Sequence, residues 1–422
     1  MHAVNTESSQ FNRGSNNGSN NGSNNGNTNT HTNTNTNAYK AAYNRHRRRP
    51  LDPNYIDDLN DLVDFSALGS HDARIVLRND PTNNAKPNNT KTADKYTYEG
   101  PLLGLVSHPG FVYIPQALSK NVQNDLAYQA LTEFCSPPHV TNIDLVPIKK
   151  GEALNRDDES MWALWKKEHF HHVDAQMVEN STQKPRMENS KNKTKEKLRA
   201  YKSFDKLSFA TTGYHYDWTA RAYVEECQSP MPKVMDRLGC IFAQLDERDE
   251  HEAFTASASI VNYYTTKSNM GGHRDDLELD FTRPVVSISL GLPVVFLLGG
   301  KTKDDDNVVP ILVRPGDVML LAGESRLCYH GMARVIPMDV SLPSPRQSIG
   351  GADTSEFQIQ SLNEIGNDDC TSNLEKALIM PKSDLEAVET FLSRHRININ
   401  VRQVLPHGVT TIPKARCSVS TG

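Results

Sequence analysis

The sequence predicts an α+β protein whose core is an antiparallel β-sandwich or jelly roll. From Phe254 onward, short runs rich in β-branched and aromatic residues follow one another, and Gly, Pro and Asp separate them. Many short strands with frequent turn signals are typical of antiparallel folds, whereas parallel sheets need long crossover helices between strands. The chain also contains neither a G-x-G-x-x-G nor a Walker A sequence.

The N-terminal part has the composition of a disordered tail. Residues 13–38 form an Asn/Gly/Ser/Thr repeat with almost no apolar side chain to bury. We expect residues 1–95 to be a disordered tail that contains the basic cluster 45–49, followed by Pro50. This cluster is either a nuclear-localisation or nucleic-acid-binding arm, or a solvated basic spot.

Ordered structure is expected to begin near Gly110, where FVYIP alternates like a strand. Ser119 can then cap a helix with apolar Val122, Leu126, Ala130 and Leu131, and residues 374–393 carry the apolar stripe of a late helix. Three regions follow the N-terminal tail. They are an N-terminal extension (96–253) with a Lys-rich insert (181–197), a β-rich core (254–405) with a polar insert (341–373), and a C-terminal tail (406–422).

Composition excludes several classes of protein. The 422 residues hold 46 Lys plus Arg against 51 Asp plus Glu, a net charge of −5, so nucleic-acid binding would need a local basic patch. The six cysteines are scattered without a C-x-x-C pair, which disfavours a disulfide framework or thiolate zinc site and favours a reducing compartment. The apolar stretch 285–298 is too short and too broken to span a bilayer, and the first residues are polar. We therefore expect a soluble intracellular protein without a membrane segment.

Two histidines and one aspartate could form a metal site. In an extended segment, His273 and Asp275 point to the same face because side chains alternate along a strand. His330 lies in the strand-like run SRLCYHGMARV and could supply a third ligand. Two His and one carboxylate form the facial triad of non-haem Fe(II) oxygenases, although an isolated H-x-D triplet is more often a solvated loop.

The segment 396–402 alternates strictly between polar and β-branched residues. On a strand, Arg396, Asn398, Asn400 and Arg402 would line one face, and the three β-branched residues would pack on the other. Two arginines on an inward face are costly without anionic partners, and a bound dicarboxylate would supply these. Asn262 and Tyr264 form a second polar pair at positions i and i+2, which could bind the same carboxylate.

These motifs together closely resemble the AlkB family of Fe(II)/2-oxoglutarate dioxygenases. The resemblance runs in order through N-x-Y (262–264), H-x-D (273–275), SISLGLPVVFLLGG (287–300), GDVMLLAGESRLCYHG (316–331) and RININVRQVL (396–405). It covers about residues 205–405. The segments TGYHYDW (212–218) and VRQVL (401–405) look most like the eukaryotic homologue-one branch of that family.

The resemblance implies a double-stranded β-helix, or jelly roll, preceded by a helical and hairpin region that forms a nucleotide-recognition lid. By similarity, His273, Asp275 and His330 match the ligands of Fe(II). Asn262, Tyr264 and Arg396 match contacts to the distal carboxylate of 2-oxoglutarate, and Arg402 and Asn398 match contacts nearer the metal. The implied cofactors are Fe(II), 2-oxoglutarate as cosubstrate and O2.

The resemblance also implies substrate contacts. Tyr214, His215, Tyr216 and Phe209 would lie near a base extracted from its neighbours, since aromatic rings stack on such a base. Lys303 stands near the place where bacterial members carry a substrate-facing Arg. Two departures from the family pattern bear on binding. Asn400 stands where Thr is usual, and Leu277 stands where bacterial members carry an acidic residue.

The implied activity is oxidative demethylation of a methylated base, with N6-methyladenine in DNA or 1-methyladenine in tRNA as the substrate. The products would be formaldehyde, succinate and CO2. Oxidation of 5-methylcytosine in tRNA, and demethylation of a histone or other protein by the same mechanism, remain alternatives. A non-enzymatic binding module is disfavoured because the residues expected at all three metal-ligand positions and both arginines are present. We expect a monomer in the nucleus, with cytoplasm or mitochondrion as alternatives.

Overall fold

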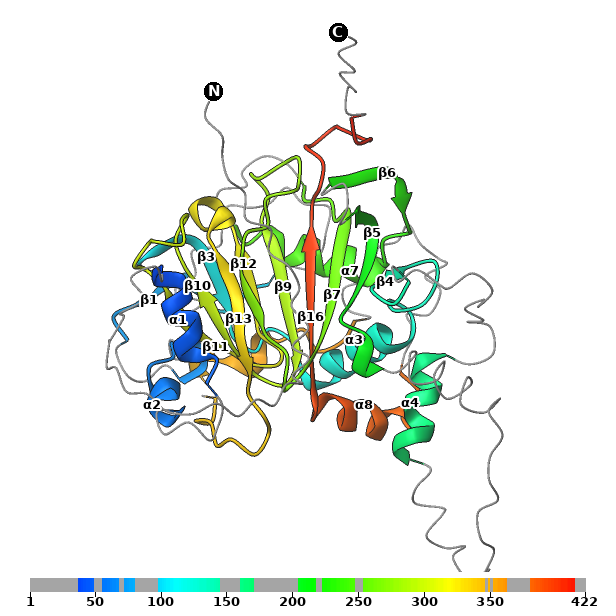
Figure 1. Ribbon diagram of the computed structural model, residues 1–422, viewed down its shortest axis with the longest axis horizontal. Helices are drawn as coiled ribbons and strands as arrows, with labels where there is room; N and C mark the ends of the chain where they lie inside the picture. Colours follow the sequence, from blue (N-terminus) through cyan, green and yellow to red (C-terminus); the bar gives the residue numbers. More distant parts are fainter. Residues whose placement is uncertain are drawn as a thin grey trace, which may run out of the picture. The chain divides into compact units, whose positions relative to one another are not determined.

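The computed structural model describes residues 37–48, 55–67, 72–79, 98–144, 160–170, 204–217, 222–246, 253–345, 348–349, 352–362 and 380–413. All of them belong to one compact unit, Asn37–Gly422. Figure 1 shows two antiparallel sheets at its centre, with helices packed beside them.

The major sheet has ten strands. Nine follow the order β1-β2-β3-β12-β9-β16-β7-β5-β4, and β6 pairs with β5. Their bounds are Ile75–Asn79 (β1), Leu102–Leu105 (β2), His108–Ile114 (β3), Val140–Thr141 (β4), Phe209–Asp217 (β5), Ala222–Gln228 (β6), Ala258–Thr265 (β7), Val285–Gly291 (β9), Val318–Leu321 (β12) and His395–Arg402 (β16). Strand β16 lies between β7 and β9, with Arg396 opposite Tyr264 and Asn398 opposite both Asn262 and Ser289. The predicted strand 396–402 is therefore confirmed as a central strand.

The minor sheet has four strands in the order β11-β10-β13-β8. Their bounds are Val309–Val313 (β11), Val294–Leu298 (β10), His330–Val335 (β13) and Met270–His273 (β8). The pairs within both sheets are antiparallel, and a cavity lies between β7, β9, β12 and β16 of the major sheet and β8, β10 and β13 of the minor sheet. This arrangement is consistent with the predicted jelly roll. A short β14–β15 pair (Ser348–Ile349 and Ala352–Asp353) stands apart.

Helices pack on the major sheet through the largest apolar core. They are α3 (Lys120–Thr132), α4 (Met161–Phe170), α7 (Lys233–Ala243) and α8 (Leu385–Leu392), with short 3-10 turns at Phe204–Lys206, Gly323–Leu327, Thr354–Phe357 and Lys382–Asp384. The core side chains of β16, Ile397, Ile399 and Val401, are fully buried in this cluster, so the opposite face of β16 is left for its polar residues. The predicted cap is present, because the Ser119 hydroxyl accepts a hydrogen bond from Val122 N over 3.4 Å.

The expectation that residues 1–95 are disordered is wrong for the described segments of that region. Helix α1 (Ala38–His46), helix α2 (Tyr55–Asn60), a 3-10 turn (Phe65–Ala67) and strand β1 are folded. Tyr39, Val63 and Phe65 are at most 3% exposed and pack with residues of the minor sheet. Local composition did not reveal this, because a few apolar side chains in a polar stretch gain burial only from a distant partner surface. Residues 1–36 and 80–95 lie outside the described residues.

The basic cluster is also not a free arm where it is described. Arg45 Nε lies 3.0 Å from Asp58 Oδ1 and Arg45 Nη1 lies 3.0 Å from Asp61 Oδ2, while Arg48 Nη1 lies 3.5 Å from Asp58 Oδ2. These ion pairs join the end of α1 to α2 and the turn that follows it. Arg49 lies outside the described residues.

Three other boundaries differ from expectation. Ordered structure begins well before Gly110, and the late helix α8 begins at Leu385, because Pro381 favours an extended residue before it and a new helical turn after it. The polar insert 341–373 is partly integrated in the fold. Ile359 is fully buried, and its N–H donates to Ala117 O over 2.9 Å. The Lys-rich insert 181–197 lies outside the described residues.

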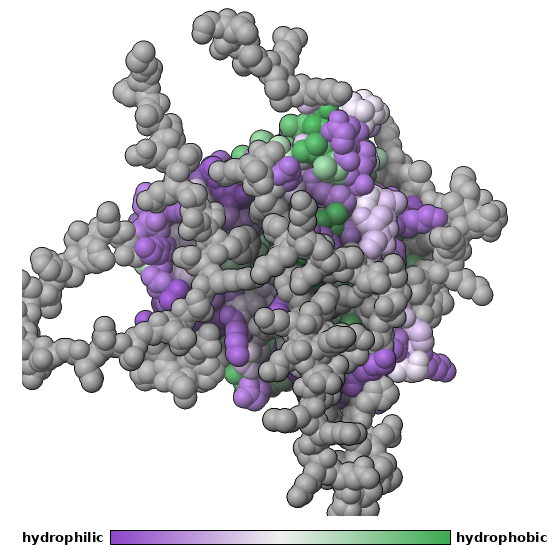
Figure 2. Space-filling view, turned by 45° about the vertical axis from the view of Figure 1, so that its right-hand side comes forward, coloured by the Kyte–Doolittle hydropathy of each residue, from purple (hydrophilic) through white to green (hydrophobic). Residues whose placement is uncertain are grey.

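On the face that Figure 2 shows, most of the coloured residues are hydrophilic, with hydrophobic residues grouped near the top of the view. No helix among the described residues is both long and apolar enough to cross a membrane. The four cysteines in the described segments, Cys135, Cys227, Cys240 and Cys328, carry free thiols.

Candidate active site

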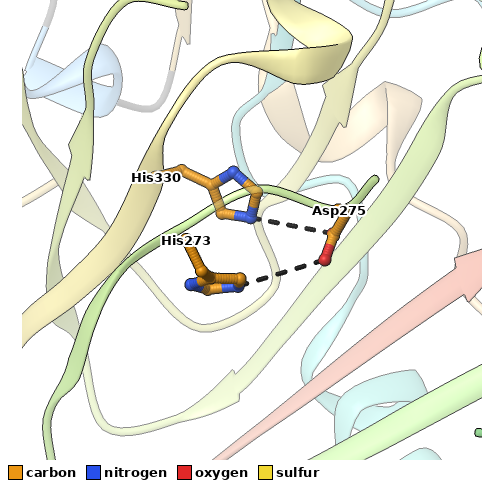
Figure 3. Close-up of side chains that lie close together, drawn as sticks. All are labelled: His273, Asp275 and His330. Atoms are coloured by element: carbon orange, nitrogen blue, oxygen red, sulfur yellow. Dashed lines mark ion pairs between the residues drawn. The ribbon is translucent and has the colours of Figure 1, made fainter. Parts of the chain in front are cut away.

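His273, Asp275 and His330 converge as predicted, at the ends of two paired strands. His273 is the last residue of β8 and His330 the first of β13, and the pairing of these strands places the two directly opposite each other. His273 Nε2 lies 4.0 Å from Asp275 Oδ1, and His330 Nε2 lies 3.7 Å from Asp275 Oδ2 (Figure 3). One ligand atom of each residue lies within 4.8 Å of the others, so one cation could contact all three.

Hydrogen bonds fix which nitrogen of each imidazole is available. Nδ1 of His273 lies 3.1 Å from Gly271 O, and Nδ1 of His330 lies 3.1 Å from Cys328 O. A carbonyl only accepts, so each Nδ1 carries a proton, and each Nε2 faces Asp275 and is the nitrogen left to bind a metal. Burial and the neighbouring His273 lower the pKa of His330 to about 4, so this ring is neutral near pH 7. Two imidazoles and one carboxylate are a donor set that fits Fe(II).

A buried network of four charges holds Asp275. Arg402 Nη2 lies 2.9 Å from Asp275 Oδ2, and Arg326 Nη1 donates to Asp275 O over 2.5 Å. Glu278 joins the two arginines, at 3.0 Å from Arg326 Nη2 and 3.5 Å from Arg402 Nε. Burial opposes ionisation of Asp275, but the positive charges of Arg402 and Arg326 outweigh it and lower the pKa of this carboxyl. Asp275 is therefore an anion ready to bind a cation.

The cavity between the sheets connects the triad to a second buried arginine. It is lined by polar side chains from β7, β9 and β16 beside apolar ones, and the polar ones besides the triad are Tyr264, Ser287, Arg396, Asn398 and Asn400. The face of β16 that was predicted to point inward therefore does so.

Arg396 has the environment of an anion-binding residue. It is 3% exposed, and its hydrogen bonds go to neutral oxygens, 2.9 Å to Ser289 Oγ and 3.3 Å to Leu292 O. Within the described part of the chain no carboxylate forms an ion pair with it. Burial accordingly lowers the pKa of Arg396 to about 10. A dicarboxylate in the cavity would compensate this charge, so the residues present fit 2-oxoglutarate.

Other predicted carboxylate contacts lie close by. Asn262 is buried and pairs with Asn398 in the strand register, but it does not line the cavity. Asn398 Nδ2 donates to Ser287 Oγ over 2.9 Å. Arg402 contacts Asp275 and Glu278, as described above, so its guanidinium lies beside the triad.

The predicted substrate residues lie outside the lining of this cavity. Tyr214 and Tyr216 belong to an apolar cluster with Tyr223 of β6, next to Leu277. His215 Nδ1 lies 2.8 Å from Thr211 Oγ1, and Phe209 lies half-buried at the start of β5, opposite Asn262. The structure therefore brings the tyrosines together around one hairpin but directs His215 elsewhere.

Lys303 lies on the rim near the triad. Its Nζ lies 5.3 Å from the ring centre of Tyr329, the residue before His330, and the guanidinium of Arg274 lies 5.2 Å from the same ring. Arg274 also forms an ion pair with Asp276 over 3.1 Å, and the side chain of Asp276 is 38% exposed. Two cations therefore lie on one aromatic ring beside the triad. The acidic residues Asp276 and Asp304 to Asp306 lie next to them in the sequence.

Sequence reasoning missed three functional neighbours: Glu278, Arg326 and Tyr223. Glu278 lies in the acidic run DDLELD, which resembles a solvated loop, and its two arginine partners are distant in the sequence. No spacing rule could have found them. Ser287 and Ser289 did carry a signal, because two serines at i and i+2 in an apolar strand share one face.

Comparisons with known proteins agree with this geometry. The profile of the 2OG-Fe(II) oxygenase superfamily matches residues 167–402. The DNA N(6)-methyladenine demethylase ALKBH1A of Arabidopsis thaliana is 29% identical over 82% of this chain and 87% of its own length. The nucleic acid dioxygenase ALKBH1 of Homo sapiens is 27% identical over 82% and 79%. The tRNA demethylase abh1 of Schizosaccharomyces pombe is 28% identical over 48% and 54%.

The superfamily match covers more than half of the chain, and the donor set at the triad suits the metal in the superfamily's description. The protein is thus a dioxygenase that uses Fe(II), 2-oxoglutarate and O2. The chain belongs to the 2OG-Fe(II) oxygenase superfamily and, within it, to the AlkB family, where it is similar over about four fifths of its length to ALKBH1A of Arabidopsis thaliana and ALKBH1 of Homo sapiens.

Proposed function

We propose that this protein oxidatively removes methyl groups from bases of nucleic acid, N6-methyladenine in DNA or 1-methyladenine in tRNA. His273, Asp275 and His330 hold Fe(II) through their Nε2 and carboxylate atoms. When bound, Fe(II) supplies the oxidation of the methyl group by O2, with 2-oxoglutarate as the cosubstrate. The protein's own residues bind and orient the cosubstrate and the base, and they exclude water from the site.

Arg396 binds the distal carboxylate of 2-oxoglutarate. Its guanidinium is already oriented by Ser289 and Leu292, so little conformational freedom is lost when the anion enters. Tyr264 and Asn262 of β7 contribute to binding the same distal carboxylate. Arg402 and Asn398 contribute to binding the carboxylate that lies nearer the metal. Arg402 is the residue that also keeps Asp275 ionised, which couples cosubstrate binding to the state of the metal ligand.

The β5–β6 hairpin is the nucleotide-recognition lid of this proposal. Tyr214, Tyr216 and Tyr223 gather there, and the ring centres of Tyr216 and Tyr223 lie 5.8 Å apart in an edge-to-face arrangement. The Tyr223 hydroxyl reaches Arg402 Nη1 at 3.4 Å, so the hairpin touches the network around Asp275. Aromatic rings next to the reacting centre are suited to stack on a base held outside its helix.

The observation that carries a nucleic-acid substrate is the pair of cations beside the triad. Arg274, whose side chain is 37% exposed, and Lys303 flank Tyr329 directly before His330. A base that reaches the triad brings its phosphates near these two side chains, which can contact them. The names of the plant and fission-yeast relatives support DNA and tRNA respectively.

The test is nucleoside mass spectrometry with purified full-length protein, Fe(II), ascorbate and 2-oxoglutarate. Single-stranded DNA with N6-methyladenine and tRNA with 1-methyladenine are supplied in separate reactions, and formaldehyde and succinate are measured in parallel. Asp275→Asn is the inactive variant. Asp339→Asn, the same change at an exposed aspartate, is the matched control.

We expect loss of one methylated adenine with formaldehyde in equal amount, in wild-type and Asp339→Asn protein but not in Asp275→Asn protein. Loss from DNA alone or tRNA alone identifies the substrate. If 2-oxoglutarate is converted to succinate while both adenines persist, the proposed substrates are wrong, and 5-methylcytosine in tRNA or a histone becomes the next substrate to assay. The monomeric state and the nuclear location stay predictions, to be checked by light scattering and by imaging a fluorescent fusion.

A further inference from the structure

The N-terminal helix α1 packs on the minor sheet beside the strands that carry the metal ligands. It contacts β8, β10 and β13, and β8 and β13 end and begin with His273 and His330. The Tyr43 hydroxyl donates to Asn269 Oδ1 over 2.6 Å, which ties the helix to the turn before β8. Helix α1 can therefore affect the positions of His273 and His330 through these strands, although it does not line the cavity.

Tyr39 is the buried residue through which this helix packs on the minor sheet. It is 3% exposed, its N–H donates to Lys303 O over 3.0 Å, and its hydroxyl lies 3.4 Å from Leu297 O of β10. Its ring centre lies 6.4 Å from that of Tyr329. The ring thus contacts the loop at Lys303, strand β10 and the residue before His330 together.

Three glycines make room for the Tyr39 ring. A Cβ on Gly299 would lie 2.7 Å from Tyr39 Cδ2, a Cβ on Gly331 would lie 2.9 Å from the Tyr39 hydroxyl, and a Cβ on Gly272 would overlap the ring edge. Gly272 directly precedes His273 and Gly331 directly follows His330. The ring therefore fills a hollow immediately behind both histidines.

Strand β8 needs such support. It has four residues, two of them glycine, and it lies at the edge of the minor sheet with β13 as its neighbour. Its pairing with β13 is irregular between His330 and Met332. Glycine gives up more conformational freedom than other residues on folding, and an edge strand is held from one side only. His273 itself is 37% exposed on its side chain, so packing around the ring does not fix it.

We propose that Tyr39 is a positioning residue of the metal centre, which holds β8 against β13 and so sets the separation of His273 and His330. The inference rests on the proposed assignment of these histidines as metal ligands. It does not depend on which base is the substrate. Metal affinity is sensitive to ligand position: removing a residue that orients a metal ligand commonly lowers the affinity about 10–100-fold.

The test measures binding of Mn(II) alone to the full-length apo-protein by calorimetry, with no cosubstrate or nucleic acid. Tyr39→Ala removes the ring and should weaken binding at least tenfold. Tyr39→Phe keeps the ring and loses one long hydrogen bond, so its Kd should stay within twofold of wild type. Tyr128→Ala, which removes another buried tyrosine from α3 in the core of the major sheet, is the control for general loss of stability. Its Kd should also stay within twofold.

A second pair of variants tests the space behind the histidines, and the single variant Gly299→Ala keeps the inference testable if Tyr39→Ala does not fold. Gly299→Ala adds a methyl group that displaces the ring, and the nearest atom outside Tyr39 is Tyr329 O at 3.4 Å. Alone it should weaken Mn(II) binding tenfold, and in a Tyr39→Ala background it should cause no further loss. The Co(II) d–d absorption spectrum, which reports ligand geometry, should change in Gly299→Ala and not in Tyr128→Ala.

Unchanged Kd in both Tyr39→Ala and Gly299→Ala would overturn the inference, as would equal losses in Tyr39→Ala and Tyr128→Ala. Failure of the metal-centre assignment looks different. In that case wild-type protein binds no Mn(II), or His273→Ala binds it as well as wild type.

Discussion

Replacing Glu278 with glutamine removes the negative charge that Arg326 and Arg402 share. The Glu278 side chain is 1% exposed, and the two arginine side chains are 2% and 8% exposed. With Asp275, the group holds two positive and two negative charges in a space that excludes water. Glutamine has nearly the same volume, so the variant changes the charge and little of the packing.

The size of the effect follows from these contacts. The variant weakens the 3.0 Å contact with Arg326 and the 3.5 Å contact with Arg402, and it leaves one buried positive charge uncompensated. Breaking one partner of a buried pair costs about 3–5 kcal/mol. The amide oxygen of glutamine can still accept one hydrogen bond, so we expect the lower end, about 3 kcal/mol. An extra positive charge near Asp275 also opposes a divalent cation, so metal affinity should fall too.

Urea unfolding followed by tryptophan fluorescence measures this loss. With a slope of about 3 kcal/mol/M, a loss of about 3 kcal/mol lowers the midpoint by about 1 M at unchanged slope. Glu386→Gln makes the same chemical change at an exposed position of α8 and should shift stability by less than about 0.5 kcal/mol. If Glu278→Gln and Glu386→Gln unfold at the same urea concentration, the argument that Glu278 stabilises the arginines is wrong.

Three further predictions concern the cosubstrate, the N-terminal helix and the core. Arg396→Lys loses the guanidinium fork and should raise the KM for 2-oxoglutarate about 10–100-fold in a succinate assay; a KM within twofold of wild type contradicts the assigned role. Burial and Arg45 lower the pKa of His46 to about 4, so between pH 6.5 and 4 the unfolded chain binds a proton that the folded chain does not. Stability should therefore fall as the pH drops through this range, and His46→Gln should show a smaller drop in Tm between pH 7 and pH 5. Phe391→Ala should lower the free energy of unfolding by about 3–5 kcal/mol, measured in urea, because this fully buried ring stacks on His395 and contacts Trp165 edge-on. A loss below about 1 kcal/mol would show that neighbouring side chains repack to fill the cavity.

The parts of the site that follow a short-range pattern could be predicted. The alternation along 396–402 fixed which side chains share a face of β16, and the i, i+2 spacing of His273 and Asp275 suggested a common direction. The strand itself ends at His273, so Asp275 reaches the triad from the segment after β8 rather than from the strand. The N-terminal region was misjudged, because its polar composition concealed Tyr39 and Phe65, whose burial depends on the minor sheet.

The sequence by itself determined the antiparallel class and the face of β16 that carries the arginines, because each follows from residue type and strand periodicity. The resemblance to the AlkB family, rather than periodicity alone, singled out the three residues of the triad. Only the tertiary structure decided that Glu278 joins Arg326 to Arg402 and that Tyr39 fills the hollow behind His273 and His330. Contacts of this kind join residues from distant parts of the chain, and their free energy depends on burial that the fold creates. No local pattern records that burial, since the same glutamate or tyrosine on an exposed loop would contribute almost nothing.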